Sequence, residues 1–167
     1  MVASPPPARA LRIHRVGHPT VALALESTRV YTFGRAPRAR ILMPSPHVSR
    51  LHGQLDAVGG RWTFVDPGTP NGSYLFRVRD LIFTEATGEL LPCVRLAPGQ
   101  PGWLRSGEGV LLGCREMWFE LLREVPPDAV GPDRANPPSV QAWLSEPAEE
   151  RRTPDLLPEL LDPDLGV

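Results

Sequence analysis

The chain has 167 residues, which is enough for one ordinary domain and a tail but too few for two well-packed cores. Its 21 prolines and 15 glycines favour many short strands over long helices. The net charge of −1 and the lack of an apolar run of about 18 residues exclude a strongly basic nucleic-acid binder and a membrane-spanning protein, and we expect a cytoplasmic location.

Residues 1–10 are rich in Pro and Ala and lack apolar periodicity, so we expect a disordered leader there. From residue 11, short runs of alternating or β-rich sequence follow one another, and Gly- and Pro-containing turns separate them. The expected strands and short apolar segments lie at 11–16, 21–25, 30–33, 41–43, 51–58, 61–65, 73–76, 93–96, 103–104, 110–113 and 117–122.

Residues 76–92 are harder to interpret. They contain a β-capable run at 81–84 and a turn at 87–88, so we expect an inserted hairpin or a long loop. The chain shows no convincing amphipathic helix. About ten or eleven short strands at close spacing predict an all-β fold, an antiparallel β-sandwich over residues 11–125.

Residues 126–167 have a different composition. They contain nine prolines, and nine acidic residues against three arginines, so we expect an acidic, Pro-rich, disordered tail that cannot form a core of its own. Two apolar islands at 140–144 and 156–161 could dock on another surface. A solvated tail with incidental apolar residues is the alternative.

Three loops between residues 32 and 72 carry the polar groups that best suit a ligand. They contain Gly34-Arg35, Ser49 to His52 and Asn71-Gly72, and expected strands border each of them. Loops on a rigid β scaffold commonly carry binding residues. Guanidinium, hydroxyl and amide groups, with backbone N–H groups beside glycines, suit a phosphate or another oxyanion.

The ordered set of motifs resembles the forkhead-associated (FHA) domain family. It consists of G-R, then S-R-L-H about fourteen residues later, then D-x-x-T-x-N-G after a Trp-containing strand, and L-R-S-G-E-G-V-L-L-G near the end. The resemblance covers residues 11–122. It implies an eleven-stranded β-sandwich that binds phosphothreonine peptides in bacterial Ser/Thr-kinase signalling, with a phosphothreonine-containing protein as partner and a kinase among the candidates.

The resemblance also implies roles for five phosphopeptide-binding residues. Arg35 would pair with the phosphate, Ser49 would donate its hydroxyl to it, and Arg50 would add a second cation. Asn71 would hold the peptide backbone, and Thr69 would contribute to the same loop. The alternatives are that Arg35 and Arg50 are only solvated charges in an arginine-rich chain, and that Ser49 only caps a turn.

Four further residues would act around these groups. Gly34 and Gly72 would permit positive φ angles and close backbone approach. His52 would support the loops by hydrogen bonding rather than contact the ligand, and His47 would contribute to peptide selectivity. The segment after Gly72 departs from the family pattern, which alters the rim beside the binding loops.

Other functions find less support in the sequence. Cys93 and Cys114 lack metal-ligand spacing, and no nucleophile-base pair or phosphate-cradling motif is present, so we expect no metal, no cofactor and no enzyme. A phosphate-independent interaction or structural domain is the main alternative. Thr153, in the tail sequence R-R-T-P-D-L, is a candidate phosphorylated ligand for the same or a neighbouring molecule.

Overall fold

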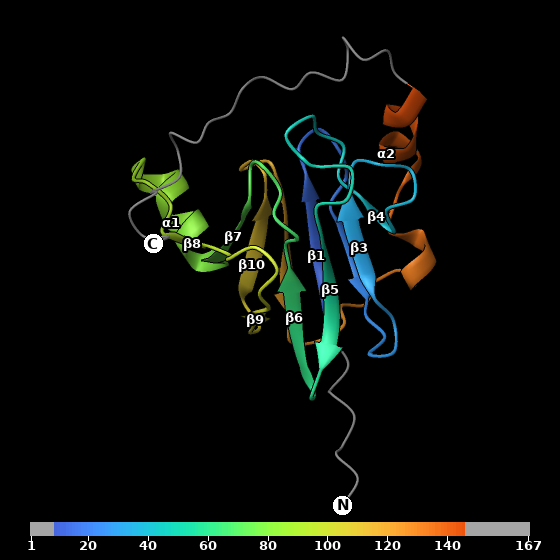
Figure 1. Cartoon of the computed structure of the whole chain (residues 1–167), viewed down its shortest axis with the longest axis horizontal. Helices are drawn as coiled ribbons and strands as arrows, with labels where there is room; N and C mark the ends of the chain where they lie inside the picture. The colour runs from blue at the N-terminus through green and yellow to red at the C-terminus, as the bar shows by residue number, and fades with distance from the viewer. Residues whose placement is uncertain (1–8, 146–167) are drawn as a thin grey trace, which may run out of the picture.

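A computed structural model describes residues 9–145. The expectations for residues 1–8 and 146–167, which include the island at 156–161 and Thr153, lie outside these residues. The predicted disorder is wrong for residues 9 and 10, because Ala10 begins the first strand and Arg9 O accepts a hydrogen bond from Leu25 N–H. The described part is a sandwich of two β-sheets (Figure 1), so the predicted β-sandwich is confirmed. Its eleven strands are β1 (Ala10–Arg15), β2 (Val21–Ala24), β3 (Tyr31–Gly34), β4 (Ile41–Leu42), β5 (Gly53–Val58), β6 (Arg61–Val65), β7 (Ser73–Arg77), β8 (Cys93–Arg95), β9 (Gly102–Leu104), β10 (Glu108–Leu112) and β11 (Met117–Leu122).

The strands form a six-stranded sheet, β2-β1-β11-β10-β7-β8, and a five-stranded sheet, β4-β3-β5-β6-β9. All pairs of these strands are antiparallel except β3 and β4, which are parallel. Alternating burial along β1 and β11 follows from the two-residue period of a strand. The core between the sheets centres on Phe33, Phe64 and Phe119, whose ring centroids lie 4.6 to 5.7 Å apart.

The antiparallel pairing brings several connections to one end of the sandwich. Phe33 at the end of β3 pairs with Gly53 at the start of β5, and Gln54 pairs with Val65 at the end of β6. In the other sheet, the start of β7 pairs with the end of β10. The loops 35–40, 43–52, 66–72 and 113–116 therefore meet at this end, which we call the loop end.

A helix, α1 (Val78–Thr87), occupies the segment for which the sequence predicted a hairpin or long loop, so that prediction is wrong. Leu81 and Thr84 are its buried residues, and Leu81 packs on a satellite core of the six-stranded sheet. The helix ends at Thr87 and is capped by Gly88, whose φ of 73° is left-handed. The β-rich run misled the prediction because Ile82 and Phe83 are exposed on this helix rather than buried in a sheet.

Residues 126–145 form an ordered segment, which we call the C-terminal strap, so the predicted disorder is wrong for them. The strap contains η1 (Pro132–Arg134), α2 (Pro138–Ala142) and η2 (Trp143–Ser145). Its Val130 N–H donates to Ala22 O at 2.8 Å, and Ala24 N–H donates to Val130 O at 3.0 Å. The strap and α1 lie at opposite edges of the molecule (Figure 1).

The strap is held to the body of the domain by buried polar contacts. Arg15 is 3% exposed and donates to Ala135 O at 2.8 Å and Asn136 Oδ1 at 3.1 Å. Burial lowers the pKa of Arg15 to about 10. Asn136 also accepts from Leu42 N–H and donates to Arg40 O. The proline-rich strap is therefore ordered because residues of the sheets supply hydrogen-bond partners that the strap does not contain itself.

Candidate functional site

The first two loops of the loop end are joined by their backbones. Arg35 N–H donates to Ser49 O at 3.1 Å, and Ala36 N–H donates to Arg50 O at 3.2 Å. Gly34 allows this contact, because a Cβ atom at residue 34 would lie 2.1 Å from Arg50 O. The φ angle of Gly34 is not positive, so close approach alone explains this glycine. The pairing places Arg35 beside Ser49.

His52 connects this pair of loops to the third loop. The Ser49 N–H donates to His52 Nδ1 at 3.0 Å, so the ring proton resides on Nε2, which donates to Gly72 O at 2.9 Å. His52 is fully buried, and burial lowers its pKa below the ordinary value, although the Gly72 hydrogen bond opposes this shift. His52 is therefore a neutral ring with a fixed tautomer that ties two loops together.

Asp66 is the acceptor at the centre of the third loop. Its Oδ1 accepts from the backbone N–H groups of Gly68 and Thr69, and its Oδ2 accepts from the hydroxyls of Thr69 and Ser73 at 2.7 and 2.6 Å. Burial by itself raises the pKa of Asp66, but the hydrogen bonds from Ser73, Thr69 and Gly68 together bring it below its ordinary value. We call His52, Asp66, Thr69 and Ser73 the buried polar network.

Sequence reasoning assigned no role to Asp66 or Ser73. The available signal was the D-x-x-T spacing, because an aspartate that caps the N–H groups two and three residues later is a common turn device. Thr69 is 8% exposed and donates its hydroxyl to Asp66. Thr69 therefore faces the buried polar network rather than the surface.

Asn71 links the third loop to the second from the outside. Its side chain is exposed and its Nδ2 donates to His47 O at 2.9 Å. Gly72 has a φ of 76°, so it needs the conformational freedom of glycine. Its carbonyl also accepts from Gly113 N–H at 3.0 Å, which attaches the loop between β10 and β11 to the same assembly.

Arg35 and Arg50 carry charges that no side chain of residues 9–145 neutralises. Arg35 is half-buried and Arg50 is exposed. Within residues 9–145 neither side chain forms a hydrogen bond or an ion pair. The nearby Arg40, in contrast, forms an ion pair with Asp133 at 3.4 Å. A guanidinium that no carboxylate neutralises, next to a hydroxyl, can bind an oxyanion through short charge-assisted hydrogen bonds.

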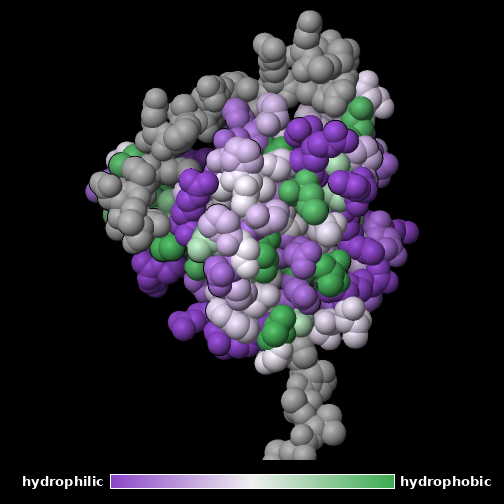
Figure 2. All heavy atoms as spheres, in the orientation of Figure 1, coloured by the Kyte–Doolittle hydropathy of each residue, from purple (hydrophilic) through white to green (hydrophobic). Residues whose placement is uncertain are grey.

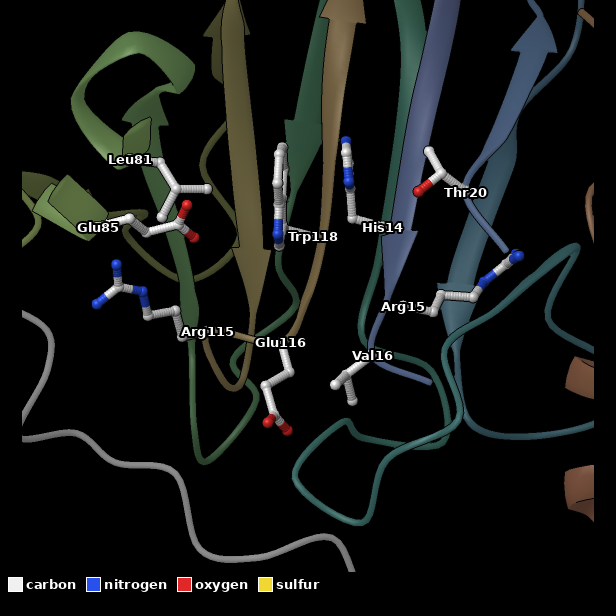
Figure 3. Close-up of a pocket in the computed structure, with 9 residues that line it drawn as sticks. All are labelled: His14, Arg15, Val16, Thr20, Leu81, Glu85, Arg115, Glu116 and Trp118. Carbon is white, nitrogen blue, oxygen red and sulfur yellow. The ribbon is translucent and has the colours of Figure 1, made fainter. Parts of the chain in front are cut away.

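A separate cavity of about 400 Å³ lies on the outer face of the six-stranded sheet (Figure 3). His14 and Trp118 are stacked there with ring centroids 3.6 Å apart, and Leu81 and Glu85 of α1 line one side. None of the predicted site residues lines this cavity. In residues 9–145 we find no cluster of three or more metal-ligating side chains. No helix in the same range is long and apolar enough to cross a membrane.

Comparisons with known proteins agree with the fold. The FHA domain family model matches residues 31–113. The FHA domain of an Arabidopsis thaliana hypothetical protein is 19% identical with a TM-score of 0.55, covering 78% of this chain and 98% of that one. The FHA domain of CT664 protein from Chlamydia trachomatis is 18% identical with a TM-score of 0.53, covering 70% and 98%.

A third similar structure is that of EmbR from Mycobacterium tuberculosis in complex with a low affinity phosphopeptide. It is 16% identical with a TM-score of 0.51, and the alignment covers 71% of this chain and 25% of that one. A search of curated proteins finds no match. The family model and the solved structures together show that this chain belongs to the FHA domain family, whose members typically bind phosphothreonine peptides.

Proposed function

We propose that this protein is a phosphothreonine-peptide-binding adaptor in Ser/Thr-kinase-dependent signalling. The observation that carries the proposal is the backbone hydrogen bond between Arg35 and Ser49, which makes neighbours of two residues, one with a guanidinium that no carboxylate of residues 9–145 neutralises and one with a hydroxyl. Phosphothreonine carries a charge of about −1.5 to −2 at pH 7 and three acceptor oxygens. The loop end offers donors and positive charge of the matching kind.

Three side chains bind the phosphate in this proposal. Arg35 donates from its planar guanidinium, Ser49 donates its hydroxyl, and Arg50 adds a second cation from the rim. Each hydrogen bond to a charged group contributes about 1.5–3 kcal/mol. Several such bonds are consistent with micromolar peptide affinity, which corresponds to about −8 kcal/mol.

The third loop holds the peptide main chain. Asn71 uses one N–H for His47 O, so its amide oxygen and its second N–H remain for the peptide. Thr69 does not contact the peptide but stabilises the loop through its hydroxyl hydrogen bond to Asp66. His47 has its carbonyl held by Asn71, and we retain it as a residue that contributes to peptide selectivity.

The direct test is calorimetric titration of the full chain with phosphothreonine peptides selected from a library. We expect micromolar binding, no binding of the unphosphorylated peptides, and a loss of roughly 100-fold or more for Arg35→Ala, because several charge-assisted bonds share this guanidinium. Arg79→Ala, which removes an exposed arginine of α1, is the matched control and should bind as the wild type does. Equal binding by Arg35→Ala would overturn the proposal.

A phosphate-independent interaction domain is the second candidate. It is favoured by Ile82 and Phe83 of α1, which are 66% and 56% exposed. Elsewhere, the face in Figure 2 is mainly hydrophilic with separate apolar spots. The test is affinity capture of partners before and after phosphatase treatment. Partners that persist after phosphatase treatment and are lost on Phe83→Ser would support this candidate in place of the first.

A further inference from the structure

Arg95 lies at the edge of the loop end, although it follows the α1 insertion in the sequence. It is the last residue of the edge strand β8 and pairs in register with Tyr74 of β7. The pairing brings Arg95 next to the loop that contains Asn71. Arginine at this position was not among the site residues that the sequence predicted.

The guanidinium of Arg95 is held against Gly72. A Cβ atom at residue 72 would lie 2.8 Å from Arg95 Nε and 3.0 Å from Cζ. Arg95 Nη2 donates to Pro70 O at 3.5 Å, and the guanidinium carbon lies 5.8 Å from the centre of the Tyr74 ring. The absence of a side chain at Gly72 therefore creates the space that Arg95 fills. Contacts on three sides restrict where this long side chain can go.

The charge of Arg95 is exposed and available. No carboxylate of residues 9–145 forms an ion pair with it, and the side chain is exposed to solvent. The nearest acidic group of the loop, Asp66, is buried and already accepts hydrogen bonds from Thr69 and Ser73. Arg95 is thus a positioned cation on the Asn71 side of the site, separate from Arg35 and Arg50 on the other loops.

We propose that Arg95 is a specificity-determining residue, which selects peptides with an acidic side chain beside the stretch of main chain that Asn71 holds. This inference rests on the proposed phosphothreonine-binding function. A guanidinium held by a cation–π contact and by a carbonyl retains N–H groups for a carboxylate or a second phosphoryl group, which it binds with planar, paired geometry. Asn71 would then hold the main chain of the peptide, and Arg95 would bind one acidic side chain of it.

The test uses the full chain and a set of phosphothreonine peptides that differ only in the position of one glutamate, with glutamine at that position in the matched peptides. For wild type we expect one position at which glutamate improves the affinity by roughly fivefold, the effect of a partly exposed ion pair. Arg95→Gln should bind both peptides of that pair equally, at the affinity of the glutamine peptide. Arg79→Gln should keep the wild-type preference.

Three other outcomes would overturn the inference in distinguishable ways. Equal affinity of wild type for the glutamate and glutamine peptides at every position would show that nothing selects acidic residues. A preference that survives in Arg95→Gln would assign it to another cation. A loss of affinity in Arg95→Gln that is the same for both peptides would assign Arg95 to the phosphate itself. Failure of the proposed function would appear differently, as no phosphate-dependent binding by wild type at all.

Discussion

The loop end consists of two layers, one in which the polar groups are solvated and one in which they are buried and hydrogen-bonded. In the outer layer, Arg35, Arg50 and Arg95 keep solvated charges with no carboxylate partner in the described residues. In the inner layer, the buried polar network satisfies Asp66 with four hydrogen bonds from its own chain. The difference indicates that the inner layer fixes the loops and the outer layer is left free for a ligand. Substitutions in the two layers should therefore affect different properties.

The largest effect on stability should come from Asp66→Ala. It removes the acceptor of two buried hydroxyls, of the buried Thr69 N–H and of the part-buried Gly68 N–H, so we expect a loss of about 3–5 kcal/mol in the free energy of unfolding. Urea denaturation of the full chain measures this change. Asp56→Ala is the matched control, because Asp56 is half-buried and its carboxylate makes no hydrogen bond within residues 9–145. Similar losses for the two variants would contradict the separation into layers.

The guanidinium that contacts the strap differs from those of the outer layer, because it is buried and hydrogen-bonded. Arg15 is buried and depends on Ala135 O and Asn136 Oδ1. We expect Asn136→Ala to lower the free energy of unfolding by about 2–3 kcal/mol, because a buried donor of Arg15 and the Leu42 N–H both lose an acceptor. Thermal or urea unfolding measures it. Gln141→Ala, which removes only an exposed bond to Asn136 O, should cost less than about 1 kcal/mol.

His52 should make the inner layer sensitive to pH. Its folded-state pKa is lowered mainly by burial, so as the pH falls below about 6.5 the unfolded chain takes up this proton first. The stabilisation is present above this value and is lost as the pH falls towards the folded pKa. From pH 7.5 to 5.5 we expect this residue to lower the free energy of unfolding, by no more than about 1.4 kcal/mol for its one proton. Urea titrations at both pH values should show a smaller decrease for His52→Gln than for the wild type.

The smallest stability effect should come from the outer layer. Arg35→Ala and Arg50→Ala remove charges that have no partner among the described residues, so each should change the free energy of unfolding by no more than about 0.5 kcal/mol. The same urea measurement checks this value. A loss above about 2 kcal/mol would show that these arginines contribute to folding and would remove the contrast between the layers.

The strands were predictable where burial alternates along them. The runs at 11–16 and 117–122 gave β1 and β11, because these strands bury one face in the core. Helix α1 was not predictable in this way, since Ile82 and Phe83 lie outside any core. The strap was missed because its order depends on Arg15 and Leu42, which are distant in the sequence.

The site shows a similar division. The motif residues Arg35, Ser49 and Asn71 were named from the sequence, and the structure brings their loops together at one end. The direction in which Thr69 points was not predictable, because the contact with Asp66 decides it. Arg95 was missed because strand pairing across the α1 insertion, rather than sequence spacing, places it beside Gly72.

The strap also determines how much of the chain folds as one cooperative unit. The family match at 31–113 omits β1, β2 and β11, and a fragment that ends at residue 125 would still lack the acceptors of Arg15 and the hydrogen bonds of Val130 to the edge of β2. The minimal fragment that resists proteolysis should therefore extend to about residue 145. The amide protons of Ala24 and Val130 should exchange with solvent together, as members of the same opening unit.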